Sequence, residues 1–278
     1  GLGSLFAPPP APVAVADPDP VAEADPGPRP APPPATAVAP DEGAGARVPV
    51  AVAARADRRN MAWNLAEVTY WSTQQPFLDA MRTGQRWVGH LPGQWGGRDE
   101  ADLAAAGALD ADGWILRVPE GLTHVSTMVF AEMPAGMTSF AGRWLARWQG
   151  DARVQLVGAA RSPRYQANAA SFDFTPGDGA VIVEIRGGSL RNLTLVHEDH
   201  VAAFDAGAVF HPGFLARIGD AENLRFMDWM RTNNSQLAAW DDRPGPTDYS
   251  YERRGVSLET MLALANLTGA EPWFTLPH

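Results

Sequence analysis

Short runs of alternating apolar and polar positions fill the middle of the chain. In residues 180–186, alternation places Val181, Val183 and Ile185 on one side of an extended strand. Similar runs recur about every ten residues between turn signals, at residues 114–118, 126–132, 142–149, 152–158, 171–175, 180–186 and 190–196. Short strands at this spacing predict an inserted antiparallel β-sandwich.

Strand and helix patterns alternate on either side of the predicted sandwich. Three runs are typical of buried strands, at residues 61–71, 223–230 and 271–278. Two shorter patterns predict helices, at residues 75–82 and 211–218, and residues 101–108 are expected to form a short helical or turn segment. The clearest helix covers residues 257–269, because Ser257 can cap its start and Gly269 can end it.

This order predicts an α/β fold with an inserted all-β sandwich. We expect residues 59–108 to form a first β/α unit, residues 109–197 the sandwich, and residues 198–278 the continuation of the α/β part. The three flanking strands should lie parallel in one sheet, away from the strands of the sandwich.

The first 58 residues have a different composition. They hold fourteen of the 25 prolines and only one aromatic residue, Phe6, which predicts a disordered linker rich in proline and alanine. No run of about eighteen apolar residues occurs, so no membrane-spanning helix is expected. Because such tethers commonly follow a signal peptide or an anchor, and the first residue is Gly1, we expect a processed protein that is secreted or at the cell surface.

Composition excludes several chemistries. All 22 basic residues are arginines and cysteine is absent, which removes lysine-based and thiol-based catalysis and every thiolate metal site. The net charge of −10 argues against a nucleic-acid partner. Ten tryptophans are many for 278 residues, and an indole either fills a core or stacks on the face of a sugar ring.

Polar and aromatic residues gather where the three flanking strands are expected to end. In parallel α/β folds these carboxyl ends carry the ligand groups. Carboxylate, guanidinium, amide and indole groups together suit a polyhydroxylated ligand. The expected substrate-binding residues are Asn64, Trp71, Asp228, Trp229, Arg231, Asn233, Asn234 and His278. An alternative is structural: Asp228 and Arg231 could form an ion pair, and Trp229 could belong to the core.

Five motifs stand out beside these residues: NLA at 64–66, WSTQQPFLD at 71–79, GHLPGQWGG at 89–97, RFMDWMRTNNS at 225–235 and EPWFTLPH at 271–278. Together they resemble a bacterial, secreted glycoside-hydrolase-like (β/α)8 family related to the large retaining-glycosidase clan. The resemblance covers the chain from about residue 60 and matches the opening half of that family. It implies a partial (β/α)8 barrel that a sandwich interrupts after the first β/α unit.

The resemblance does not supply catalytic residues. Retaining glycosidases use two carboxylates about 5–5.5 Å apart, and in this clan they follow the fourth and seventh barrel strands. The chain is expected to end at the third strand, so the catalytic residues remain unknown. Glu67 and Asp228 would then contact substrate or support the residues that do.

Other motifs indicate weaker hypotheses. The sequence HEDH at 197–200, with His211 downstream, could bind a metal, but a solvated turn leaving the sandwich is the preferred interpretation. A hairpin turn is preferred to a calcium loop for DADG at 110–113. The glycines of residues 89–97 do not form a nucleotide-binding fingerprint. We therefore expect no metal and no cofactor.

Two functions remain open. The first is the N-terminal part of a secreted glycoside-hydrolase-like protein that acts on a polysaccharide and lacks the catalytic glutamates. The second is a non-catalytic carbohydrate-binding or surface-assembly protein in which the sandwich is the working module. The expected partner is a polysaccharide or oligosaccharide, with a second chain or a C-terminal half completing the barrel.

Overall fold

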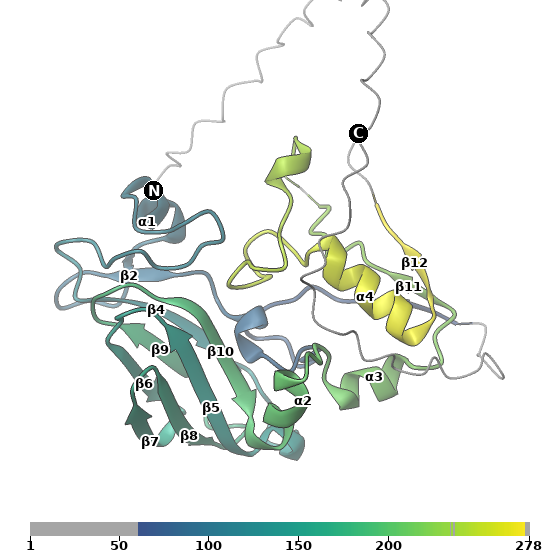
Figure 1. Cartoon of the computed structure of the whole chain (residues 1–278), viewed down its shortest axis with the longest axis horizontal. Helices are drawn as coiled ribbons and strands as arrows, with labels where there is room; N and C mark the ends of the chain where they lie inside the picture. Colours follow the sequence, from purple (N-terminus) through teal and green to yellow (C-terminus); the bar gives the residue numbers. More distant parts are fainter. Residues whose placement is uncertain (1–60, 234, 236, 276–278) are drawn as a thin grey trace, which may run out of the picture. The chain divides into compact units, whose positions relative to one another are not determined.

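The computed structural model describes residues 61–233, 235 and 237–275. The linker expected over residues 1–58 lies outside the described residues, as do Asn234 and His278. The described residues form one parallel and two antiparallel sheets, with few helices and no closed barrel (Figure 1). None of the described helices is long and apolar enough to span a membrane.

The parallel sheet contains the three strands that flank the sandwich in the sequence. They are β1 (Ala62–Asn64), β11 (Asn223–Arg225) and β12 (Glu271–Trp273), in the order β1-β11-β12. Both pairings are parallel, which confirms that the three strands share one sheet. The strands are shorter than expected, because the chain turns at residues 227–231 instead of continuing as a strand.

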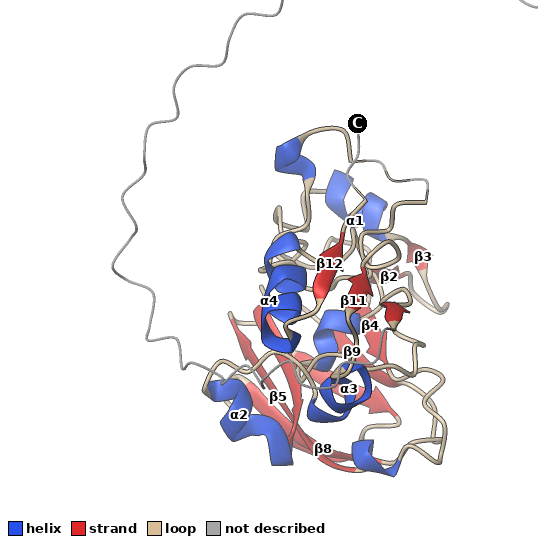
Figure 2. Ribbon diagram, turned by 90° about the vertical axis from the view of Figure 1, so that its right-hand side faces the viewer, coloured by secondary structure: helices blue, strands red, loops and turns tan. Residues whose placement is uncertain are grey.

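Two helices cover one face of the parallel sheet, and both begin where the sequence predicts. Helix α3 (Pro212–Ile218) starts after His211, whose Nδ1 accepts a hydrogen bond from the Gly213 N–H at 3.0 Å. Helix α4 (Leu258–Thr268) starts after Ser257 and ends at Gly269, where φ is +66°. Both helices pack around the buried Leu224 of β11, and Figure 2 shows them beside the parallel strands.

The two antiparallel sheets enclose the largest hydrophobic core. The first sheet has the order β10-β5-β8-β7: β5 (Gly142–Gln149), β7 (Arg161–Gln166), β8 (Ala169–Phe174) and β10 (Arg191–His197). The second has the order β3-β2-β4-β9-β6: β2 (Val88–His90), β3 (Gly97–Arg98), β4 (His124–Val129), β6 (Val154–Gly158) and β9 (Val181–Ile185). The alternation expected in β9 is confirmed, because Val181, Val183 and Ile185 are fully buried in this core.

Several elements of the sandwich differ from the expectation. Strands β2 and β3 lie within residues 59–108, so the second sheet begins before residue 109. Residues 114–118 form isolated bridges through Ile115 instead of a strand. Strand β7 was not predicted, because all six of its residues are exposed and no apolar alternation marks it.

The shorter helical elements surround these sheets. The segment expected to be a short helix or a turn at residues 101–108 contains helix α1 (Glu100–Ala105), and Asp99 and Asp102 form a capping box at its start. The helix expected over residues 75–82 is only one 3-10 turn, η1 (Ala80–Thr83). The remaining described helical elements are η2 (Thr138–Phe140), η3 (Glu198–His200), α2 (Val201–Asp205) and η4 (Trp240–Asp242).

The chain enters and leaves the sandwich through two segments that pair with each other. Phe77 and Phe210 form an antiparallel bridge, and the Leu78 N–H donates to the Val209 carbonyl at 2.9 Å. Asp79 extends this contact into β10, because its Oδ1 accepts from the N–H groups of Met81 at 3.0 Å and Leu195 at 2.9 Å. Asp79 is fully buried, and this burial raises its pKa.

We predict that Asp79→Ala lowers the free energy of unfolding by about 2–3 kcal/mol, because two buried N–H groups lose their acceptor. Asp79→Asn retains an Oδ1 acceptor and should cost about 1 kcal/mol or less. Urea denaturation followed by tryptophan fluorescence measures both values. Equal losses in the two variants would contradict this role of the carboxylate.

Candidate functional site

A hydrogen bond joins the carboxyl ends of the first two parallel strands. Asn64 is the last residue of β1, and Asp228 lies in the turn after β11. Asn64 Nδ2 donates to Asp228 Oδ2 at 3.0 Å. The amide oxygen of Asn64 and Asp228 Oδ1 have no hydrogen-bond partner among the described residues and can accept from ligand hydroxyls.

A second link between the same strand ends is an ion pair. Arg231 Nη1 lies 2.8 Å from Glu67 Oε1, and the same nitrogen donates to the main-chain oxygen of Glu252 at 2.7 Å. Arg231 adopts a left-handed backbone with φ of +49°. Because this conformation is uncommon outside glycine, the tight turn that aims the guanidinium at Glu67 carries local strain.

Glu252 brings a third carboxylate to this edge of the sheet. Its Oε2 accepts from the Tyr70 N–H at 3.2 Å. Burial raises the pKa of Glu252 to about 7, although the Tyr70 N–H and the Arg231 charge favour the ionised form. Glu252 therefore exchanges its proton near neutral pH. The sequence offered no signal for this residue, because Glu252 lies in a loop without periodicity.

A row of side chains faces away from the two helices. Asn64, Arg225 and Trp273 are in register on the three parallel strands and therefore share one face of the sheet. The Arg225 guanidinium lies over the Trp273 ring, 5.0 Å from its centroid, and Trp273 is 58% exposed. Arg225 and Trp273 were missed as site residues; the available signal was the position of Arg225 next to the apolar Leu224 and of Trp273 within another predicted strand.

Of the expected site residues, the structure brings Asn64 and Asp228 into contact and buries Trp229 in the core. The expectation that Trp229 contacts ligand is wrong, because its side chain is 1% exposed and packs against Phe77, Phe214 and Phe226. Arg231 pairs with Glu67 and not with Asp228. Trp71 is 48% exposed, and Asn233 is also exposed.

The histidines of the HEDH motif meet His211 at the exit from the sandwich. The ring centroids of His197 and His200 are 5.9 Å apart, and those of His200 and His211 are 5.0 Å apart. His197 is buried and ends β10, so this part of the motif is not a solvated turn. Burial and the two neighbouring histidines lower the pKa of His211 to about 4. Within the described part of the chain no group of side chains is arranged to hold a metal ion.

The glycine-rich residues 89–97 lie in a hairpin formed by β2 and β3. Strands β2 and β3 pair antiparallel through Gly89 and His90, and the Gly96 N–H donates to His90 Nδ1 at 2.8 Å. In the DADG motif, Gly113 has φ of +83° and its N–H donates to the Asp110 carbonyl at 3.0 Å, as the preferred turn requires.

No family model, curated protein or solved structure matches this chain. The functional argument therefore depends on the groups at the carboxyl ends of β1 and β11 and on the exposed face of the parallel sheet.

We predict opposite outcomes for the two tryptophans expected at the site. Trp229→Ala should lower the free energy of unfolding by about 3–5 kcal/mol, because it empties a packed aromatic core. Trp71→Ala should change it by less than about 0.5 kcal/mol, because the indole is half exposed. Urea denaturation of both variants decides this, and a Trp229→Ala protein as stable as the parent would contradict the core assignment.

We predict that Glu252 makes stability fall as pH rises. Its pKa is raised in the folded state, so its stabilising contribution is complete below pH 4.5 and is lost as pH rises through about 7. The loss should be about 1–2 kcal/mol, since solvent screens the partly exposed carboxylate. Glu252→Gln should remove this part of the pH dependence. Unfolding profiles from pH 4.5 to 8 that coincide in shape for parent and variant would refute the assignment.

Proposed function

We propose that this chain is the opening part of a glycoside-hydrolase-like (β/α)8 barrel that binds a polysaccharide at the carboxyl edge of its parallel sheet. Consecutive parallel strands are neighbours in the sheet, in the order β1-β11-β12. A helix, α3 or α4, lies between each pair of strands in the sequence, and both helices cover the same face. A barrel wall would have its helices on one face in the same way, with the other face turned inward, which supports the proposal.

The chemistry of the strand ends supports a saccharide ligand. Asn64 and Asp228 present acceptors without a partner among the described residues, Glu67 and Arg231 form a partly exposed ion pair, and Trp273 presents an indole. Hydroxyl groups need such acceptors and donors, while a sugar face packs on an aromatic ring. The hydrogen bond between Asn64 and Asp228 carries most of the argument, because it holds two polar groups from different strands at one position.

The proposed role of these groups is substrate binding. The two glutamates that the resemblance places after later barrel strands are not assigned to any residue of this chain. The second hypothesis, a non-catalytic carbohydrate-binding or surface-assembly protein with the sandwich as its working module, predicts binding that does not depend on Asp228. Secretion and a bacterial source remain part of the proposal.

Calorimetry against a panel of neutral and acidic oligosaccharides tests the proposal. We predict that Asp228→Asn and Asn64→Ala each weaken binding by more than about 1 kcal/mol, the scale of one lost hydrogen bond to a charged group. The matched control is Asp173→Asn, because Asp173 also makes one exposed side-chain contact but lies on β8 of the sandwich. Equal effects of Asp173→Asn and Asp228→Asn, or no binding by the parent, would contradict the proposal.

A reducing-sugar assay separates binding from turnover. We expect no hydrolysis by this chain. Hydrolysis that Glu67→Gln, Asp228→Asn or Glu252→Gln abolishes would show that these acids catalyse the reaction, and the assignment to substrate binding would fail.

A further inference from the structure

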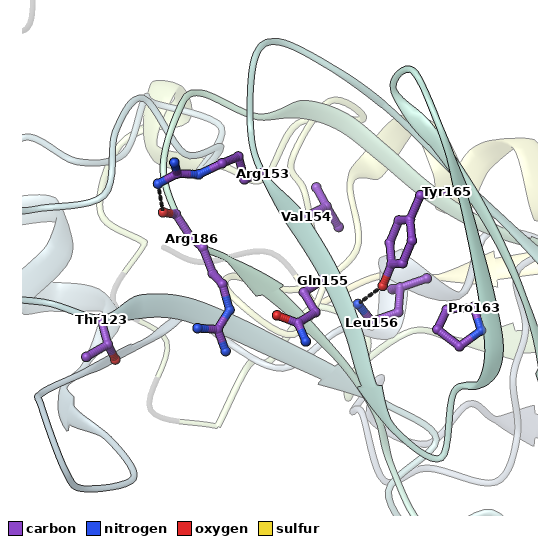
Figure 3. Close-up of a pocket in the computed structure, with 8 residues that line it drawn as sticks. All are labelled: Thr123, Arg153, Val154, Gln155, Leu156, Pro163, Tyr165 and Arg186. Atoms are coloured by element: carbon purple, nitrogen blue, oxygen red, sulfur yellow. Dashed lines mark hydrogen bonds between the residues drawn. The ribbon is translucent and has the colours of Figure 1, made fainter.

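A cleft opens where the edge strands of the two sandwich sheets meet. It has a volume of about 620 Å³ and lies between β6 of one sheet and β7 of the other (Figure 3). Polar side chains line much of it: Thr123, Arg153, Gln155, Tyr165 and Arg186. None of these residues belongs to the parallel sheet or to its carboxyl edge.

The two arginines of the cleft are held in different ways. Arg186 donates to Glu184 Oε2 through Nη2 at 2.6 Å, so its charge is largely compensated. Arg153 donates to the main-chain oxygen of Arg186 at 2.7 Å and has no carboxylate partner among the described residues. A Cβ atom at Gly187 would lie 2.9 Å from Arg153 Nη2, so the glycine makes room for this guanidinium. Arg153 is thus an oriented cation that no carboxylate of the described residues compensates.

The opposite wall of the cleft carries an aromatic ring. Tyr165 is 46% exposed, and its hydroxyl oxygen accepts from the Leu156 N–H at 2.8 Å, which leaves the phenolic hydrogen free to donate. In Figure 3 the side chains of Gln155 and Arg186 lie next to each other, with Tyr165 on the neighbouring strand. The Gln155 amide makes no hydrogen bond to a described residue and can bind hydroxyl groups.

We infer that this cleft binds a uronate-containing oligosaccharide. A guanidinium forms two parallel hydrogen bonds with a carboxylate, so Arg153 would take the acid group of one sugar. The Tyr165 ring would pack against a sugar face, and Gln155 would bind ring hydroxyls. This inference rests on the proposed function for the ligand class, a saccharide. It assigns the acidic units of that saccharide to a separate site on the sandwich.

The cleft suits a saccharide better than a nucleic acid. Single-stranded nucleic acid is bound by successive aromatic rings along a positively charged groove. This cleft offers one ring, and the charge of Arg186 is paired with Glu184. With a net charge of −10, the chain has little long-range attraction for a polyphosphate.

The test measures binding of a hexamer of galacturonate to the full chain by calorimetry, in buffer without divalent cations. Arg153→Gln should weaken binding about tenfold, and Tyr165→Ala by a similar factor. Arg164→Gln is the matched control, because it removes the same charge from β7. The register places Arg164 opposite Ser171 on the outer face of the sheet, whereas Tyr165 lies opposite the buried Ala170. The control should change affinity less than twofold.

Other outcomes would overturn the inference. Equal losses in Arg153→Gln and Arg164→Gln would indicate a general charge effect. A neutral galactose hexamer that binds as tightly as the uronate would assign another ligand class. So would a single-stranded DNA that binds more tightly than the uronate and whose affinity falls in Arg153→Gln.

Asp228→Asn separates this inference from the proposed function. Uronate binding that survives Asp228→Asn and fails in Arg153→Gln supports the cleft, whatever the fate of the parallel-sheet site. Binding that fails in Asp228→Asn and survives Arg153→Gln would place the uronate at the parallel sheet, which refutes the cleft and leaves the proposed function intact.

Discussion

The arrangement of the sheets in the described residues depends on the pairing of the two segments that enter and leave the sandwich. An inserted domain must begin and end at nearby points, and here the hydrogen bond from Leu78 to Val209 and the bridge between Phe77 and Phe210 hold those points together. Phe77 also packs against Trp229 and Tyr251, with ring centroids 5.6 and 5.3 Å apart. The same crossing therefore supports the sandwich and the loops that carry the site.

The turn after β11 shows how this packing produces the site. Trp229 points into the aromatic cluster, so its neighbours Asp228 and Arg231 are directed toward the edge of the sheet. The loop at Gly255 lies close against this turn: a Cβ atom at Gly255 would lie 2.6 Å from the Trp229 carbonyl oxygen, and Gly255 has φ of +102°. The Val256 N–H donates to the Trp229 carbonyl at 2.8 Å, which joins this loop to the turn that follows β11.

Local signals in the sequence predicted the elements that local chemistry determines. Ser257 and Gly269 bound α4 because capping and left-handed geometry act within a few residues. The strand β7 could not be predicted, since its residues are exposed and only its neighbour β8 makes it a strand. Trp229 and Glu252 depend on contacts far along the chain, with Phe77 and Tyr70, so neither the core role nor the raised pKa leaves a periodic pattern.

The two proposed saccharide-binding surfaces differ in the charge of their side chains. The edge of the parallel sheet carries the carboxyl groups of Glu67, Asp228 and Glu252, and Arg231 is already paired with Glu67, so hydroxyl groups are favoured there over an acidic sugar. At the sandwich cleft, Arg153 has no carboxylate partner among the described residues. Because salt screens exposed charges beyond about 10 Å, the net charge of −10 does not prevent a local cation from binding a carboxylate. In the proposed arrangement, a polymer that contains acidic and neutral sugars therefore binds through its carboxylates at the sandwich and through its hydroxyl groups at the parallel sheet.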